Sequence, residues 1–387
     1  MSGPILIATG GTGGHVFPAR ALAETLLARG HRVGLVTDRR GTAFETERGP
    51  LDVHRIRAAG IAGRGVIAKA RAVGELLLGY LEARRLIRTL APTAVVGFGG
   101  YASVPTVMAA SARGVPVVLH EQNAVLGRAN RLLAARADAI AVSFADVQKV
   151  RAADRGKLAL TGNPVREAIR AVRDRVQPVL VDGAPIQLLV TGGSQGASVF
   201  AELVPAAVAL LPAALRTRLR LSQQVREIES EQVTDAYRVL GVEADVRRFF
   251  DDMPARLADA RLLICRSGAS TVAENTVAGR AALLVPYPHA IDDHQAANAR
   301  AVATAGGALV LPQSTTDAAT LAAVLVELLE DPARLAAMAG AARGVGVPDA
   351  VDRLADLVER HVRTAGARNT PAGGAATTDQ YARRAAA

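Results

Sequence analysis

Short runs of apolar, often β-branched residues alternate along the chain with longer stretches that mix Ala and Leu with Arg. A short apolar run predicts a buried strand, and a longer stretch with helical spacing predicts an amphipathic helix. The predicted strands are residues 5–9, 32–37, 94–98, 116–120, 139–143, 187–191, 262–265 and 282–285. The predicted helices are residues 19–28, 80–90, 130–136, 199–211, 271–278 and 295–304. Because apolar strands alternate with helices, we expect an α/β fold with parallel sheets that helices cover on both faces.

One sequence pattern occurs twice, as LIATGGTGG at residues 6–14 and as LLVTGGSQG at residues 188–196. Each copy indicates a strand, a glycine-rich turn and the start of a helix, which is how Rossmann-like domains begin. The repeat predicts two such domains in tandem, with a linker around residues 166–185. The last helix of the second domain is a candidate to pack back on the first. The expected division is 1–165 for the first domain, 166–363 for the second and 364–387 for a disordered tail.

Composition and charge exclude several classes of protein. The chain has 387 residues, half of them hydrophobic, which suits a two-domain globular protein and not a disordered chain. Its single cysteine, Cys265, excludes a disulfide framework and a cysteine-based zinc site. The formal net charge of +10 comes from scattered arginines in a chain with few aromatics, so nucleic acid is the least expected partner. Phosphorylated substrates and an anionic membrane surface are the partners that this charge favours.

The chain shows no pattern for export or membrane insertion. Its first residues, MSGPILIATGG, lack the basic and long apolar regions of a signal peptide. The longest uncharged stretch, residues 90–112, is interrupted by glycine and proline, so it indicates a strand, a loop and a helix start. We therefore expect a cytoplasmic protein whose only membrane contact is peripheral.

Both glycine-rich turns are candidate phosphate sites. A turn that opens a helix presents free N–H groups and the positive end of the helix dipole, and both attract phosphate. The alternative is a tight turn that only packs a helix against its strand. A nicotinamide-dependent oxidoreductase is disfavoured, because the frame that starts at Gly11 has Val16 where the dinucleotide motif requires glycine. The Walker A pattern is also absent.

Eight segments resemble those of a known enzyme family when they are taken in order. They are TGGTGGHVFPA (9–19), GFGGYASVP (97–105), HEQN (120–123), GNPVR (162–166), TGGSQGA (191–197), FFDDM (249–253), CRSGASTVAE (265–274) and PYPHAIDDHQAANA (286–299). Together they closely resemble the MurG family of bacterial hexosyltransferases, within glycosyltransferase family 28, over residues 4–361. The resemblance implies the GT-B fold, in which two Rossmann-like domains face a central cleft.

The resemblance also implies an activity. Members of the family are inverting glycosyltransferases that move GlcNAc from UDP-GlcNAc to the C4 hydroxyl of MurNAc in undecaprenyl-diphospho-MurNAc-pentapeptide. This step converts lipid I to lipid II in peptidoglycan synthesis. On the residues alone, a glycolipid synthase, a UDP-GlcNAc epimerase and a two-lobed binding protein without chemistry stay open as alternatives.

The resemblance places UDP-GlcNAc mainly in the C-terminal half. Glu274 matches a carboxylate that binds the ribose hydroxyls, Gln295 a side chain that binds the sugar, and Arg166 an arginine near the donor phosphates. The other implied donor contacts are Thr12, Gly13, Gly14, Asn123, Ser194, Phe250, Ala269, Ser270, Thr271, Val272 and Ala273. Solvated surface side chains are the alternative for Glu274 and Arg166, and a core position is the alternative for Phe250.

The N-terminal half is expected to take the acceptor. His15 follows the first glycine turn and is a candidate general base, since an imidazole titrates near neutral pH. A structural role or a contact with the donor sugar is the alternative for His15, and Glu121 is a second candidate base. A third glycine loop matches the position for the diphosphate of the acceptor, with a plain strand-to-helix turn as the alternative. The residues of this loop are Gly99, Gly100, Tyr101 and Ser103.

Metal and membrane contacts are the remaining expectations. His289, Asp292, Asp293 and His294 form an acidic and imidazole-rich cluster, but the resemblance favours a sugar contact there over a metal site. No cofactor and no metal are expected to be required, with stimulation by a divalent cation left open. Helix N-termini and Arg166 would then stabilise the charge of the leaving group.

The segment at residues 61–88 mixes apolar residues with Arg and Lys. Such a mixture predicts contact with an anionic membrane surface, on the cytoplasmic face of the inner membrane in the family. An ordinary core helix with a solvated basic face is the alternative. Other proteins of cell-wall synthesis are further implied partners.

Overall fold

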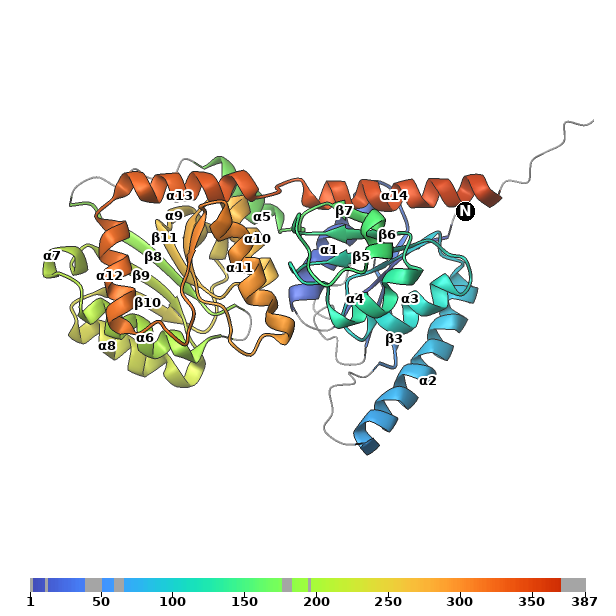
Figure 1. Cartoon of the computed structure of the whole chain (residues 1–387), viewed down its shortest axis with the longest axis horizontal. Coiled ribbons are helices and arrows are strands. Elements are labelled where there is room, and N and C mark those ends of the chain that lie inside the picture. Colours follow the sequence, from blue (N-terminus) through green and yellow to red (C-terminus); the bar gives the residue numbers. More distant parts are fainter. Residues whose placement is uncertain are drawn as a thin grey trace, which may run out of the picture.

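Buried apolar strands form two separate parallel sheets, one in each lobe of the molecule (Figure 1). The computed structural model describes residues 3–10, 13–38, 51–58, 66–175, 183–193 and 196–369. Within these residues every pair of neighbouring strands is parallel. Two domains, each built on a parallel sheet, are the arrangement of the GT-B fold that the family resemblance implies.

The first sheet has the strand order β3-β2-β1-β4-β5-β6-β7. Its strands are β1 (Ile5–Ala8), β2 (Val33–Asp38), β3 (Asp52–Ile56), β4 (Ala94–Gly97), β5 (Val117–Glu121), β6 (Ala139–Val142) and β7 (Leu158–Leu160). Its helices are α1 (Gly13–Ala28), α2 (Val66–Leu90), α3 (Ser103–Ser111) and α4 (Arg128–Leu133), with 3-10 turns η2 (Ala134–Arg136) and η3 (Ala152–Lys157).

The second sheet has the strand order β10-β9-β8-β11-β12-β13. Its strands are β8 (Ile186–Thr191), β9 (Leu219–Gln224), β10 (Glu243–Arg247), β11 (Leu262–Cys265), β12 (Ala281–Leu284) and β13 (Ala308–Val310). The helices from the linker onward are α5 (Glu167–Arg170), α6 (Ser198–Ala209), α7 (Ala213–Arg216), α8 (Ser230–Val239), α9 (Met253–Asp259), α10 (Ala269–Ala278), α11 (His294–Thr304), α12 (Ala318–Leu329), α13 (Pro332–Val345) and α14 (Ala350–Asn369). The 3-10 turns of this half are η4 (Ala171–Asp174), η5 (Glu227–Glu229) and η6 (Ile291–Asp293).

All eight predicted strands are present, with ends that differ by at most one residue. The described part of the chain contains five further strands that were not predicted, namely β3, β7, β9, β10 and β13. Most of these lie at or near a sheet edge, where polar residues are tolerated on an exposed face, so DVHRI and EADVR carry no continuous apolar pattern. Among the helices, α1 and α2 begin well before the predicted residues 19 and 80, and α1 contains Pro18 in its interior.

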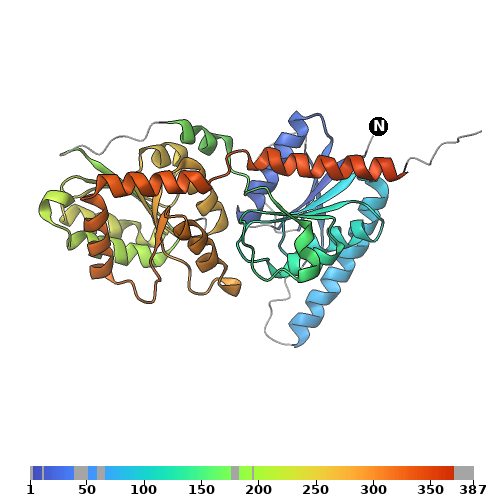
Figure 2. The same cartoon turned by 45° about the horizontal axis from the view of Figure 1, so that its top comes forward.

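Helix α14 returns from the second half of the chain to pack on the first domain (Figures 1 and 2). Its apolar residues Leu354 and Val358 lie fully buried among side chains of β1 and α1. On its polar side, Asp352 and Asp356 both pair with Arg29 of the first domain, at 3.1 and 2.7 Å. The helix continues past residue 364, where the sequence predicts the tail to begin, and ends at Asn369.

The chain therefore crosses between the domains twice, and the two crossings touch. Gly162 lies in the first crossing with φ +81, a backbone conformation that glycine adopts without strain. A Cβ atom on Gly162 would come within 2.7 Å of the Cβ of Val347, which lies in the second crossing. The close approach leaves no room for a larger residue at position 162.

Helix α2 slants away from the body of the first domain (Figures 1 and 2). Val73, Leu77 and Leu81 recur on one face of it at helical spacing, and each is about half exposed. Among the described residues no helix combines the length and the apolar character that a membrane span needs.

Candidate functional site

A cavity lies where three neighbouring strands of the first sheet end. Strands β1, β4 and β5 are adjacent and parallel, so the segments that follow them leave the same edge of the sheet. The chain order reverses between β1 and β4, which is the point where open α/β sheets bind ligands. A pocket of about 410 Å³ lies here, with Ile291, Asp292 and His294 of the second domain closing one side. The pocket is thus formed by both domains.

Two glycine turns approach each other at this edge. Gly99 and Gly100 have φ of +86 and +71, and a Cβ atom on Gly100 would lie 3.4 Å from the Cα of Gly10. A Cβ atom on Gly99 would lie 3.5 Å from Cε1 of His15. The hydroxyl of Ser103 donates to the carbonyl of Gly100 at 2.9 Å and closes the turn at the start of α3. The predicted acceptor loop therefore lies directly beside the predicted base, and Tyr101 lines the same pocket.

The imidazole of His15 lines the pocket, and a contact at its Nδ1 holds it in place. Its Nδ1 lies 3.1 Å from Oε1 of Gln122, the residue that follows β5. Burial lowers the pKa of His15, while the carboxylate of Glu121 and the hydrogen bond to Gln122 oppose that shift. Because the neutral form is favoured, His15 can accept a proton at neutral pH.

Glu121 is almost fully buried, and four donors surround its carboxylate. Oε1 accepts from the backbone N–H and the side-chain Nδ2 of Asn123, at 3.0 and 3.3 Å. Oε2 accepts from the backbone N–H of Gly127 and from Nδ2 of Asn130, at 2.8 and 2.9 Å. This carboxylate therefore fixes the loop between β5 and α4 and directs no unused lone pair toward a substrate.

Asn123 lies at a joint between the domains. Its Oδ1 accepts from Nδ2 of Asn298 at 3.1 Å, and Oδ1 of Asn298 accepts from the backbone N–H of Ala124 at 2.8 Å. Asn298 is fully buried on α11, and its Nδ2 also donates to the carbonyl of Ser267 at 3.0 Å. Sequence reasoning missed Asn298, although it lies within the PYPHAIDDHQAANA segment.

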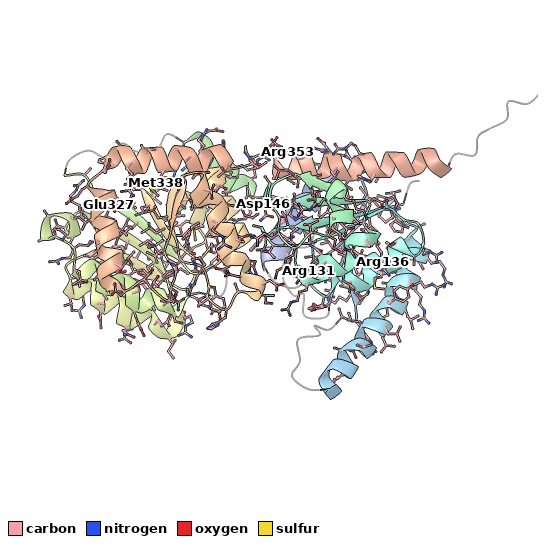
Figure 3. All side chains as sticks on the ribbon, viewed as in Figure 1. Arg131, Arg136, Asp146, Glu327, Met338 and Arg353 are labelled. Carbon is pink, nitrogen blue, oxygen red and sulfur yellow. The ribbon has the colours of Figure 1, made fainter. Side chains whose placement is uncertain are left out.

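Asp292 forms a second contact between the domains. In the left-handed backbone region at φ 56, it holds Arg131 at 2.5 Å, Lys149 at 2.8 Å and Arg128 at 3.7 Å. Figure 3 shows Arg131 on the side of the first domain that faces the second. Hydrogen bonding from Lys149 and the charge of the arginines lower the pKa of Asp292.

The loop around Asp292 does not form a metal cluster. His294 lies with its Nδ1 2.7 Å from the carbonyl of Ile291, so that nitrogen donates within its own loop. Over the described part of the chain, no three His, Cys, Asp or Glu side chains are arranged to hold a metal ion.

Arg166, at the start of the linker, pairs with Glu274 on α10 of the second domain. Arg166 donates through both Nε and Nη2 to Oε1 of Glu274, at 3.2 and 3.1 Å. Its guanidinium also lies 5.7 Å from the ring centre of Phe17 on α1. Burial raises the pKa of Glu274, and the charge of Arg166 opposes that shift. The two side chains predicted to hold ribose and phosphate are therefore within reach of one ligand.

The N-terminus of α10 presents backbone donors beside the second glycine turn. The helix follows Gly268, which offers no side-chain cap, so the N–H groups of the first turn are not capped by a side chain. A Cβ atom on Gly193 would lie 3.9 Å from the hydroxyl of Thr271. The hydroxyl of Ser270 is buried and meets no hydrogen-bond partner among the residues that the structure describes. This geometry suits an anionic group between the turn and the helix.

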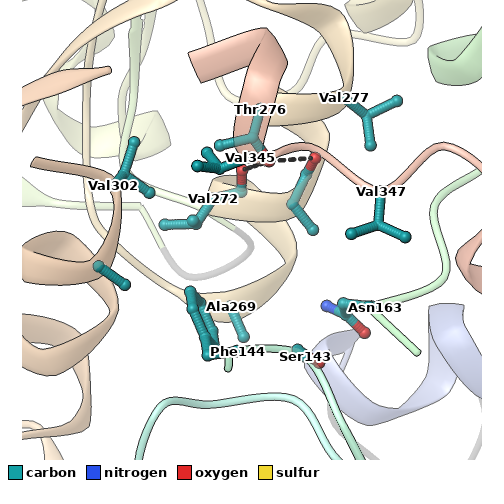
Figure 4. A pocket seen from close by; sticks show the side chains of 13 residues that line it. Ser143, Phe144, Asn163, Ala269, Val272, Thr276, Val277, Val302, Val345 and Val347 are labelled. Atoms are coloured by element: carbon teal, nitrogen blue, oxygen red, sulfur yellow. Dashed lines mark hydrogen bonds between the residues drawn. The ribbon is translucent and has the colours of Figure 1, made fainter. Parts of the chain in front are cut away.

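Three of the predicted donor residues also line a separate, small cavity. Ala269, Val272 and Ala273 surround a space of about 60 Å³ with Phe144 and Asn163 of the first domain (Figure 4). Its walls are mostly apolar, which fits a packing gap next to the crossing between the domains.

Of the remaining predicted residues, one lies in the core, some lie at the site and two lie outside the described part of the chain. The side chain of Phe250 is buried, with the guanidinium of Arg256 4.0 Å from its ring centre, so it packs as a core residue. Oε1 of Gln295 accepts from the backbone N–H of Tyr287 at 2.9 Å, and the other group of this side-chain amide is the donor Nε2. Gly13 and Gly14 begin α1. Thr12 and Ser194 lie outside the described residues.

Comparison with known proteins gives matches in both halves of the chain. Residues 5–142 match the glycosyltransferase family 28 N-terminal domain, and residues 187–354 match the glycosyltransferase family 28 C-terminal domain. A curated relative from Rhodospirillum centenum is 56% identical over 95% of this chain and 97% of its own length. That relative is named UDP-N-acetylglucosamine--N-acetylmuramyl-(pentapeptide) pyrophosphoryl-undecaprenol N-acetylglucosamine transferase.

Two solved structures resemble the fold as a whole. The crystal structure of Acinetobacter baumannii MurG matches with a TM-score of 0.76 and 30% identity, over 92% of this chain and 99% of that chain. A UDP-GlcNAc 2-epimerase from Neisseria meningitidis matches with a TM-score of 0.63 and 11% identity, over 92% of this chain and 100% of that chain. The second likeness shows a shared fold alone.

Proposed function

Because the chain belongs to glycosyltransferase family 28, we propose that it transfers GlcNAc from UDP-GlcNAc to lipid I, undecaprenyl-diphospho-MurNAc-pentapeptide. The acceptor group is the C4 hydroxyl of MurNAc, and the product is lipid II for peptidoglycan synthesis. The observation that carries the proposal is the 56% identity to the transferase of that name along 95% of the chain. The pocket between the domains is the proposed site of this reaction.

We assign the role of general base to His15. It is the pocket residue whose pKa is shifted toward the neutral form, and the glycine loop that would hold the acceptor diphosphate lies against it. Glu121 is the weaker candidate, because four hydrogen bonds occupy its two carboxylate oxygens and hold the side chain in the loop.

The reaction balances as a single displacement. The C4 hydroxyl gives its proton to Nε2 of His15, and its oxygen forms a bond to the anomeric carbon of GlcNAc. The bond from that carbon to the diphosphate oxygen breaks, and UDP leaves with the electron pair. Attack from the face opposite UDP inverts the anomeric centre, so an α-linked donor gives a β-linked product.

The donor is held by the second domain. Ribose hydroxyls bind the carboxylate of Glu274, and Arg166, which pairs with it, extends to the diphosphate. The backbone donors at the start of α10, which lie beside the turn at Gly193, stabilise the charge that develops on UDP. We propose that these groups act without a required metal or other cofactor, so that a chelator leaves turnover in place.

We also propose that the enzyme is peripheral to the cytoplasmic face of the cell membrane, where the undecaprenyl chain of lipid I lies. The half-exposed face of α2 with Val73, Leu77 and Leu81 continues into exposed Arg84 and Arg88 on the same side. Such a helix places apolar residues at the acyl boundary and arginines at anionic headgroups.

The experiment uses purified protein, labelled UDP-GlcNAc and a short-chain lipid I analogue, with UDP release and label transfer followed together. Transfer to the analogue, with none to water or diacylglycerol, is the expected result. UDP release without transfer would point to an epimerase or to another acceptor and would overturn the proposal. Repeating the assay with EDTA tests the absence of a required metal.

A further inference from the structure

A chain of buried side chains leads from the imidazole of His15 to the crossing between the domains. His15 contacts Gln122, Gln122 contacts His120, and His120 contacts the carbonyl of Gly162, with a distance of 3.1 Å at each step. Gln122 and His120 are both almost fully buried. Neither was predicted as a site residue, although both belong to the HEQN segment.

The carbonyl of Phe98 fixes which way the amide of Gln122 points. Nε2 of Gln122 lies 2.9 Å from that carbonyl oxygen, which only accepts hydrogen bonds. Turning the amide around would place two acceptors against each other, so Nε2 must face Phe98 and Oε1 must face His15. Since Oε1 also only accepts, Nδ1 of His15 must carry the proton.

The same reasoning fixes His120 in the opposite tautomer. Its Nε2 faces the carbonyl of Gly162, so Nε2 carries the proton and Nδ1 is free to accept from Nε2 of Gln122. Burial lowers the pKa of His120 to about 4, so it stays neutral at physiological pH. Every donor in this series of hydrogen-bonded side chains then meets an acceptor.

We propose that Gln122 and His120 are positioning residues that hold His15 in its Nδ1–H tautomer and keep the lone pair of Nε2 toward the pocket. The tautomer follows from the contacts alone. Its use in catalysis rests on the proposed function, in which Nε2 of His15 takes the proton of the acceptor.

A neutral orienting group has a distinct chemical consequence. An amide cannot take a proton from the imidazolium, so the proton that His15 gains must leave through the pocket after each turnover. The amide oxygen also stabilises the imidazolium less than a carboxylate in that place would. The titratable groups nearest His15 among the described residues are Glu121 and His120 on β5 and His294 on α11. Asp38, Tyr101, Arg128 and Asp292 also line the pocket.

The direct test is the tautomeric state of the two histidines, measured by NMR on protein labelled with ¹⁵N-histidine. We expect His15 as the Nδ1–H form and His120 as the Nε2–H form, with His15→Gln and His120→Gln used for assignment. A wild-type His15 with its proton on Nε2 would overturn the proposal. This readout needs no turnover, so it is independent of whether the proposed reaction is correct.

Gln122→Met removes the acceptor that faces His15 at similar side-chain volume. We expect kcat to fall at least about 10-fold while the donor KM changes little. The acid limb of the kcat profile should move to lower pH, because the hydrogen bond to Gln122 raises the pKa of His15. An unchanged acid limb, or an effect confined to KM, would overturn the positioning role.

The chain offers a matched control in Gln223. It is fully buried in the second domain, its Nε2 donates to the carbonyl of Phe200 at 2.8 Å, and its Oε1 accepts from Tyr237. Gln223→Met should lower stability to a similar extent without changing the tautomer of His15 or the acid limb. His120→Phe should reduce kcat less than Gln122→Met, because the carbonyl of Phe98 still orients the amide. Equal effects of all three variants would show a merely structural role.

Discussion

The two halves of the chain open with the same strand, glycine turn and helix, yet only the first half has a titratable side chain just beyond its turn. In the first half His15 follows the turn and is tied to β5 through Gln122. In the second half, the hydroxyl of Thr191 at the end of β8 donates to Gln224 at 2.8 Å, and Gln224 donates to a backbone carbonyl. The polar groups behind the second turn satisfy one another, and the hydroxyl of Thr191 also accepts from the backbone N–H of Gly193 at 3.2 Å.

This difference indicates how the same strand, glycine turn and helix can serve two different functions. The shared backbone supplies N–H groups and a helix dipole in both halves, which suits anionic substrates. The chemistry depends on the side chain that follows the turn and on the strand that supports it. The first half is therefore expected to control kcat and the second half the donor KM.

The variant His15→Ala is expected to have the largest effect on the difference between the two halves. If Nε2 of His15 is the base, kcat should fall by about 10²- to 10⁴-fold while the donor KM stays close to that of the wild type. Steady-state kinetics with varied UDP-GlcNAc at saturating acceptor measures both. A change in KM alone would make His15 a binding residue and remove the functional difference between the halves.

The buried imidazole of His120 in the first half should make the stability of the protein depend on pH. Its folded-state pKa of about 4 lies below its ordinary value of 6.5, so between these values the unfolded chain binds more protons than the folded one. Stability should therefore fall as the pH is lowered through this window, by about 3 kcal/mol from this group.

Chemical denaturation at several pH values measures this slope, and His120→Gln provides the comparison. The variant keeps a donor for the carbonyl of Gly162 but does not titrate, so its stability should depend less on pH between 4 and 6.5. A variant with the wild-type slope would show that His120 is not buried as a neutral group.

Glu274→Ala tests the second half of the comparison. Loss of a charge-assisted hydrogen bond to ribose should raise the donor KM about 10-fold or more, with kcat at saturating donor much less affected. Glu167→Ala is the matched control, since Glu167 is an exposed glutamate that pairs with Arg170 near the same linker. If both variants behave alike, Glu274 does not bind the ribose.

The sequence predicts the parts of this site that depend on a single segment, and it misses those that depend on two. The repeat and the apolar runs predict both sheets and place His15 at a strand end, because strand burial and glycine turns are local properties. The role of Glu121 depends on donors from Gly127 and Asn130, whose approach is set by the fold of the following loop. No local pattern indicates that Asn298 meets Asn123, since the two residues lie in different domains.

The contact at Asp292 ties the two halves together, and its removal should have the smallest effect. Asp292→Asn keeps the shape of the side chain but loses the charge that faces Arg131, Lys149 and Arg128. Because these partners are partly exposed, we expect a loss of stability below about 1 kcal/mol, and less at high salt. Denaturation at low and high ionic strength measures both. A loss of several kcal/mol that is independent of salt would contradict this expectation. It would mean that Asp292 is a buried structural charge and that this contact holds the two halves rigidly together.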